Sequence, residues 1–89
     1  MRGKIVFITG ASSGIGEGCA RKFASQGSDV ILNARNVAKL EELKKELEKA
    51  YDIRVFLLPF DVRDRKAAVD ALASLPENWK AIDVLVNNA

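Results

Sequence analysis

The stretch Thr9-Gly10-Ala11-Ser12-Ser13-Gly14-Ile15-Gly16 decides the fold of this chain. It follows a strand-like run at residues 4–8 and leads into a segment with helical periodicity up to about residue 26. A glycine-rich turn between a strand and a helix is typical of a phosphate-binding loop, because the new helix presents free N–H groups and the positive end of its dipole. A glycine-rich turn joining any strand to any helix has a similar pattern, so the rest of the chain must decide.

Each glycine of the loop has an expected role. Gly10 lets the backbone leave the strand in a tight turn, and Gly14 lets the main chain come close to a diphosphate. Gly16 lets the following helix lie close against the strand. The spacing is G-x-x-x-G-x-G, so the loop differs from the G-x-G-x-x-G pattern of other dinucleotide-binding proteins.

Strand-like and helical segments alternate along the rest of the chain. Apolar runs at 30–32, 55–58 and 84–86 predict three further strands, and Asn36 and Asp64 are good N-caps for a second and a third helix. We expect the apolar stripes of the helices to face the sheet. They comprise Ile15, Cys19, Ala20, Phe23 and Ala24, then Val37, Leu40, Leu43, Leu47 and Ala50, then Ala67, Ala68, Ala71, Leu72 and Leu75.

This alternation predicts an α/β fold with parallel strands and right-handed crossovers. The expected strand order is 3-2-1-4, which is half of a doubly wound (Rossmann) sheet plus the first strand beyond its switch point, with three helices. We expect residues 1–89 to form one half-domain. Trp79, in a turn after the third helix, is expected to fill a hydrophobic gap.

Length and composition limit the function. With 89 residues, the chain is long enough for one small domain but short of a complete dinucleotide-binding enzyme. A net charge of +2 with interleaved lysines and glutamates does not indicate a nucleic-acid partner, and no apolar run approaches the roughly 18 residues of a membrane span. One cysteine and no histidine predict no metal cluster, and the lack of a leader-like segment predicts a cytoplasmic protein.

Three motifs, the glycine loop, Asp61-Val62 and Asn87-Asn88-Ala89, follow one another in the order and spacing of a known family. On these residues the chain resembles the N-terminal part of the short-chain dehydrogenase/reductase family along its whole length. Two further stretches, residues 33–43 and 75–85, are most similar to the NADP-dependent branch acting on serine and related 3-hydroxy acids.

The resemblance implies a cofactor site made from the loop and the strand ends. The residues that would face the phosphates and ribose are Gly10, Ser12, Ser13, Gly14, Ile15 and Gly16. Asp61 and Val62 would hold the adenine edge, and Asn87 and Ala89 would line the cofactor after the fourth strand. Purely structural roles stay open, with Asp61 capping a loop and Asn87 satisfying neighbouring main chain.

The end of the second strand favours NADP(H) over NAD(H). An NAD site places a carboxylate there, roughly 20 residues beyond the glycine loop, to bind the ribose 2′-hydroxyl. Ala34 stands at that position, followed by Arg35. No acid repels a 2′-phosphate, and a guanidinium can pair with it. The alternative is that Arg35 is an ordinary solvated residue.

The residues that the resemblance implies for proton transfer, a Tyr-x-x-x-Lys pair with a serine and an asparagine, have no match here. The one tyrosine is Tyr51, and Val55 stands four residues later. We therefore expect the chain to be the cofactor-binding portion of an oxidoreductase, without catalytic residues and inactive alone. The alternative is a non-catalytic, self-standing or designed half-fold that binds nucleotide weakly or serves as an assembly module.

In either case the fourth strand, with its apolar residues 84–86, is expected to be an edge through which the chain self-associates.

Overall fold

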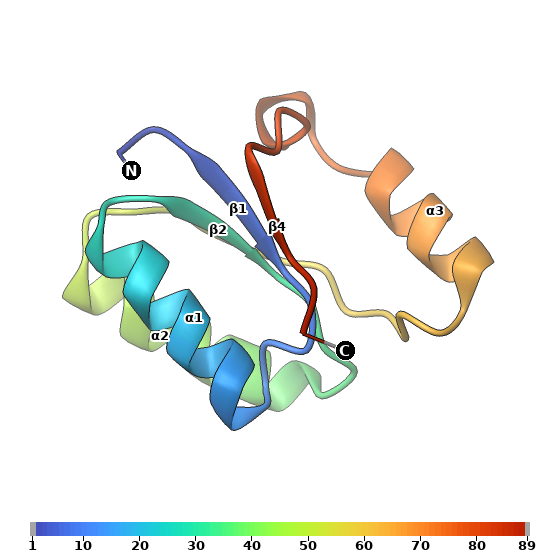
Figure 1. Ribbon diagram of the computed structural model, residues 1–89, viewed down its shortest axis with the longest axis horizontal. Helices are drawn as coiled ribbons and strands as arrows, with labels where there is room; N and C mark the ends of the chain where they lie inside the picture. Colours follow the sequence, from blue (N-terminus) through green and yellow to red (C-terminus); the bar gives the residue numbers. More distant parts are fainter. Residues whose placement is uncertain (1, 89) are drawn as a thin grey trace.

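The computed structural model describes residues 2–88, which form one four-stranded sheet with three α-helices and a short 3₁₀ helix (Figure 1). In chain order the elements are β1 (Ile5–Ile8), α1 (Gly14–Ser25), β2 (Asp29–Leu32), α2 (Val37–Ala50), β3 (Val55–Leu57), α3 (Arg65–Ala73), η1 (Glu77–Trp79) and β4 (Val84–Val86). The predicted elements are therefore present, with ends that differ by one or a few residues.

Polar side chains start each α-helix. The hydroxyl of Ser13 accepts from the N–H of the third residue of α1, and the carboxylate of Asp64 does the same in α3 at 3.1 Å. Asn36 caps α2, as the sequence predicted: its side-chain oxygen accepts from the backbone N–H of Lys39 at 3.2 Å. Gly27 ends α1 with φ +87°, a conformation that favours glycine.

The sheet order is β3-β2-β1-β4 with all neighbours parallel, which confirms the predicted order 3-2-1-4. β1 lies in the centre between β2 and β4, and Ile8 at its end is level with Leu32 and Val86. The carboxyl ends of these three strands thus meet at one edge of the sheet, where a doubly wound fold binds its ligands.

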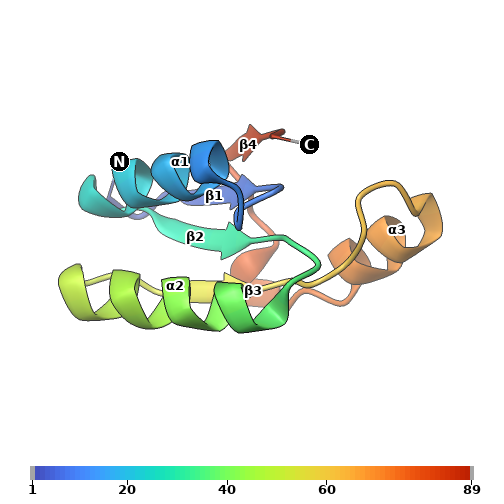
Figure 2. The same cartoon turned by 90° about the horizontal axis from the view of Figure 1, so that it is seen from below.

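Side chains alternate between the two faces of β1 and β2, and each face has its own core. On one face Val6, Ile8 and Val30 pack with buried residues of α1 and α2. On the other face Phe7 and Ile31 pack with Trp79 and its neighbours. Figures 1 and 2 show α1 and α2 together on one side of the sheet, with α3 set apart from them. The two-sided burial explains why the strands are continuous apolar runs.

Trp79 fills the predicted gap. It is buried, its ring centroid lies 5.5 Å from that of Phe56, and the guanidinium carbon of Arg54 lies 4.7 Å from its ring centroid. Arg54 also pairs with Asp29 at 2.9 Å. This cluster joins β2, β3 and η1 at the end of the sheet opposite the strand carboxyl ends.

The predicted helix stripes need correction at their ends. Ile15 is 74% exposed, so the buried face of α1 begins at Gly16 and continues through Ala20 and Ala24. In α2, Val37 is exposed and only the three leucines of the stripe are buried. The first helical turns of α1 and α2 are therefore exposed at the apolar positions Ile15 and Val37, and periodicity alone did not predict this exposure.

The prediction for α3 was wrong for Leu72, which is 40% exposed, and no residue within α3 is buried. Leu75, which follows the helix, is buried as expected. The reason is a cavity of about 470 Å³ between α3 and the face formed by β1 and β4, with Phe7, Leu72 and Leu85 among its walls. The apolar side of α3 therefore faces this cavity, and the helix does not pack tightly on the sheet.

β4 is an edge strand in the described structure, hydrogen-bonded only to β1. Leu85 is 64% exposed, and Val84 and Val86 are half-buried. The expected apolar edge is therefore present.

Candidate functional site

The loop between β1 and α1 is folded so tightly that two of its glycines cannot be replaced without overlap. Gly10 has φ +62°, and a Cβ there would overlap the backbone carbonyl of Asn88. A Cβ on Gly16 would overlap the carbonyl of Gly10 and the side chain of Asn88. Gly16 therefore allows the start of α1 to approach the loop itself, which is more specific than the helix–strand contact expected from the sequence.

Gly14 differs from these two glycines, because an added Cβ there has no protein atom within 4 Å. The first-turn N–H groups of Gly14 and Ile15 have no acceptor within the helix, and both residues are exposed. These donors, together with the helix dipole, make the start of α1 a suitable place for an anion.

The hydroxyl of Ser13 is occupied by internal hydrogen bonds. It donates to the Gly10 carbonyl at 2.9 Å, and it accepts from the Gly16 N–H at 3.2 Å and from the Asn88 side-chain amide at 2.8 Å. This uses its one proton and both lone pairs. Ser13 thus shapes the loop through its side chain, and only Ser12 has a hydroxyl at the wall of the adjoining cleft.

Thr9 and the residues after β4 hold the loop against the sheet. The Thr9 hydroxyl donates to the Asn87 side-chain oxygen at 3.2 Å and accepts from the Asn88 N–H at 2.9 Å. The Asn88 side-chain amide also reaches the Gly10 carbonyl at 3.3 Å. The structural role left open for Asn87 is therefore present, although its partner is a side chain.

Asn33 connects the glycine loop to the loop that follows β3. It is buried, and its side-chain amide donates to the carbonyls of Leu58 at 3.0 Å and Phe60 at 3.1 Å. The backbone carbonyl of Asn33 accepts from the Ala11 N–H at 2.8 Å. One residue at the end of β2 thus sets the spacing of the two loops on either side of it.

A cleft of about 350 Å³ lies between these loops, at the carboxyl edge of the sheet. It brings together five of the predicted site residues, which are Gly10, Ser12, Arg35, Asp61 and Val62. Ala34 also lines it, so the end of β2 presents no carboxylate to the cleft. The cleft is open to solvent on the side of Arg35, whose side chain is 70% exposed.

The carboxylate of Asp61 is the electrostatic centre of this cleft. Arg63 donates to it through Nε at 3.1 Å, Nη2 at 2.9 Å and its backbone N–H at 3.0 Å. Nη1 of Arg35 lies 3.8 Å from the same carboxylate. Hydrogen bonds from Arg63, together with the charge of Arg35, lower the pKa of Asp61 to about 2. Asp61 therefore carries a full negative charge between two guanidinium groups at neutral pH.

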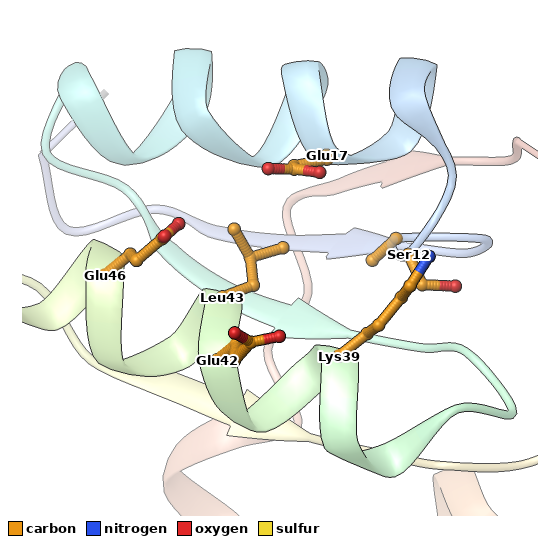
Figure 3. Close-up of a pocket in the computed structure, with 7 residues that line it drawn as sticks. Ser12, Glu17, Lys39, Glu42, Leu43 and Glu46 are labelled. Carbon is orange, nitrogen blue, oxygen red and sulfur yellow. The ribbon is translucent and has the colours of Figure 1, made fainter.

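A second, smaller cavity of about 160 Å³ lies between α1 and α2 and shares Ser12 with the cleft. Figure 3 shows Lys39 extending from α2 towards Ser12, with Glu17, Glu42 and Glu46 along the rest of the wall. This excess of carboxylates disfavours a phosphate. The guanidinium side of the glycine loop is therefore the side suited to an anionic ligand.

Among residues 2–88 there is no cluster of three or more side chains suited to hold a metal ion. The same residues include no helix that is both long and apolar enough to cross a membrane.

Comparison with known proteins identifies the family. The family model for short chain dehydrogenases matches residues 4–89, almost the whole chain. The chain belongs to the short-chain dehydrogenase family. The family assignment agrees with the parallel sheet, the glycine loop and the cleft at the carboxyl edge.

Relatives of this short-chain dehydrogenase chain are named as NADP-dependent enzymes. A probable NADP-dependent dehydrogenase of Dichelobacter nodosus is 51% identical over 96% of this chain and 76% of that protein. The NADP-dependent 3-hydroxy acid dehydrogenase YdfG of Escherichia coli is 46% identical over 96% of this chain and 33% of the enzyme. The L-sorbose reductase of Gluconobacter frateurii, solved with NADPH and L-sorbose, matches with a TM-score of 0.92 and 36% identity, over 100% of this chain and 34% of the reductase. The chain thus spans about a third of the length of the 3-hydroxy acid dehydrogenase and of the sorbose reductase.

Not every predicted site residue of this short-chain dehydrogenase chain lines the cleft. Gly14, Ile15 and Gly16 lie at the start of α1, beside the cleft. Asn87 lines the apolar cavity on the α3 side, and Ala89 lies outside the described residues.

Four residues of the cleft were missed by the sequence analysis. They are the apolar Phe60 and the polar Asn33, Arg63 and Asn88. Asn33 had a usable signal, because a polar residue directly after a buried strand must find buried partners. Asn88 belonged to a quoted motif but had no assigned role. Arg63 had no signal beyond its position two residues after Asp61.

Proposed function

We propose that this chain binds NADP(H) in the cleft and at the start of α1, as the cofactor-binding portion of an oxidoreductase. The observation that carries the proposal is the exposed guanidinium of Arg35 at the mouth of a cleft where Ala34 replaces a carboxylate. The NADP-dependent names of relatives and the NADPH complex of the sorbose reductase support it.

The residues of the site fit such a cofactor. The free N–H groups of Gly14 and Ile15 would donate to the diphosphate, and the space above Gly14 would admit it. Arg35 would pair with the 2′-phosphate. The charged carboxylate of Asp61 would accept from the adenine amine, and Val62 would offer its backbone. When bound, the cofactor supplies or accepts a hydride.

Calorimetric titration with NADP and NAD tests this proposal. We expect NADP to bind more tightly, and Arg35→Ala to reduce its affinity by about tenfold at low salt, with a smaller effect at high salt. Arg65→Ala is the control, because Arg65 is exposed on α3 and does not line the cleft. Equal affinities for the two cofactors, or an Arg35 variant that binds like the control, would refute the proposal.

The reaction of the whole protein is a further proposal. We infer from the resemblance and the relatives that it oxidises or reduces 3-hydroxy acids such as serine, and that the groups for proton transfer are not in residues 1–89. Tyr51 is unsuited to that task, because it caps the C-terminal end of α2 shortly before β3 begins, at the end of the sheet opposite the strand carboxyl ends. The 89-residue chain incubated with NADP and serine should produce no NADPH above background. A rate proportional to folded protein would contradict this.

We also propose that the exposed edge of β4 mediates self-association, most simply by antiparallel pairing with β4 of a second copy. The exposed side chain of Leu85 and the unpaired side of β4 support this.

A further inference from the structure

Two guanidinium groups from different loops converge on one carboxylate oxygen at the mouth of the cleft. Nη2 of Arg63 lies 2.9 Å from Oδ2 of Asp61, and Nη1 of Arg35 lies 3.8 Å from the same atom. Arg35 follows β2 and Arg63 follows β3, so the sheet order, rather than sequence proximity, brings this triad together.

The two arginines do not interact with Asp61 equally. Arg63 donates from Nε to one carboxylate oxygen and from Nη2 to the other, which is the bidentate geometry of a strong pair. Its backbone N–H adds a third bond at 3.0 Å. Arg35 makes only the longer ionic contact, and its side chain stays 70% exposed. Arg63 therefore satisfies Asp61 and leaves the donors of Arg35 free.

We propose that Arg63 is a positioning residue for cofactor selection, because by pairing with Asp61 it keeps Arg35 available to a 2′-phosphate. The proposal rests on the proposed binding of NADP(H). Arg63 need not contact the cofactor for this effect.

The physical reason is a competition between two anions for one cation. Without Arg63, the nearest strong donor to the Asp61 carboxylate is Arg35, and a charge-assisted hydrogen bond between them would form at the expense of the phosphate. The negative charge of Asp61 would also be uncompensated and would repel the 2′-phosphate. Even if the pKa of Asp61 returns to its ordinary value of 3.8 without Arg63, the carboxylate stays charged at neutral pH, so protonation does not remove this competition.

The test compares two ligands that differ only in the 2′-phosphate, adenosine 2′,5′-bisphosphate and 5′-AMP, by calorimetry at low salt. Their affinity ratio isolates the 2′-phosphate, because any general damage to the adenosine site affects both. We expect Arg63→Gln to lower this ratio by up to about fivefold, as befits an exposed charge pair. Arg65→Gln, which removes an exposed arginine outside the cleft, should leave the ratio unchanged.

The double variant Arg63→Gln with Asp61→Asn separates this mechanism from direct contact. If Arg63 acts by occupying Asp61, then neutralising Asp61 should restore the ratio, although both affinities fall through loss of the adenine contact. A ratio that stays low in the double variant, or one that does not change in Arg63→Gln, would overturn the proposal.

The proposed function can fail separately. If the unmodified chain does not prefer the bisphosphate, NADP(H) binding at this site is wrong. If it does prefer the bisphosphate and Arg35→Gln abolishes the preference while Arg63→Gln has no effect, only the role of Arg63 is wrong.

Discussion

The side-chain amide nitrogen of Asn88 lies 2.8 Å from the hydroxyl oxygen of Ser13, although 75 positions separate the two residues in the chain. Ser13 caps α1, and Asn88 follows β4, so this contact joins the last strand to the start of the first helix. The shape of the glycine loop therefore depends on the pairing of β4 with β1, and a variant at the end of the chain should affect ligand binding at its beginning.

Asn88→Ala should lower the free energy of unfolding by about 1–2 kcal/mol, because two side-chain hydrogen bonds to the loop are lost. Denaturant titration measures this change. Asn78→Ala is the matched control at an exposed position of η1, and there the free energy of unfolding should change by no more than about 0.5 kcal/mol. Equal effects of the two substitutions would show that the contact with the loop contributes nothing to stability.

The glycines of α1 should respond differently to alanine. Gly16→Ala should destabilise the chain by about 1–3 kcal/mol, because its Cβ would overlap the Gly10 carbonyl. Gly18→Ala, in open space within the helix, should stabilise by about 0.5–1 kcal/mol. Thermal unfolding measures both effects: the midpoint temperature should fall in Gly16→Ala and rise in Gly18→Ala.

Gly14→Ala should leave stability intact, because an added Cβ there meets no protein atom within 4 Å. NADP affinity should fall by about tenfold if a methyl group at this position crowds the diphosphate. The Gly18 variant serves as the binding control. Undiminished affinity in Gly14→Ala would place the diphosphate elsewhere.

The pH dependence of Asp61 follows from its lowered pKa. Because the folded-state pKa of about 2 lies below the ordinary 3.8, the ion pair with Arg63 stabilises the fold above about pH 3.8. This contribution is lost as the pH falls through about 2. A carboxyl NMR titration should report the low pKa, and Arg63→Gln should raise it towards 3.8. A wild-type value near 4 would mean that the pair does not form in solution.

Self-association through β4 should be sensitive to charge at position 85. Leu85→Lys should shift the chain towards monomer in light scattering, because a charge on an edge strand disfavours pairing. Val69→Lys is the control, since Val69 is 59% exposed on α3, away from the edge. A monomeric wild-type chain at high concentration would contradict the proposed contact.

Local sequence determined much of the fold. Capping at Asn36 and Asp64 and the strand–helix alternation depend on short-range hydrogen bonding and periodicity, so both could be predicted. The exposure of Ile15 and Leu72 could not, because periodicity defines a face of a helix but does not show how much of that face another element covers.

By itself the sequence determined the parallel half-sheet, the glycine loop and the absence of an acidic residue at the end of β2, since these depend on residue type and order. Only the tertiary structure decided which side chains shape the site. Asn88 reaches Ser13, Asn33 joins two loops, and Arg63 shares Asp61 with Arg35, all through strand pairings that bring distant segments together. A hydrogen bond or ion pair needs its atoms within a few ångströms, and that distance exists only once the sheet has assembled.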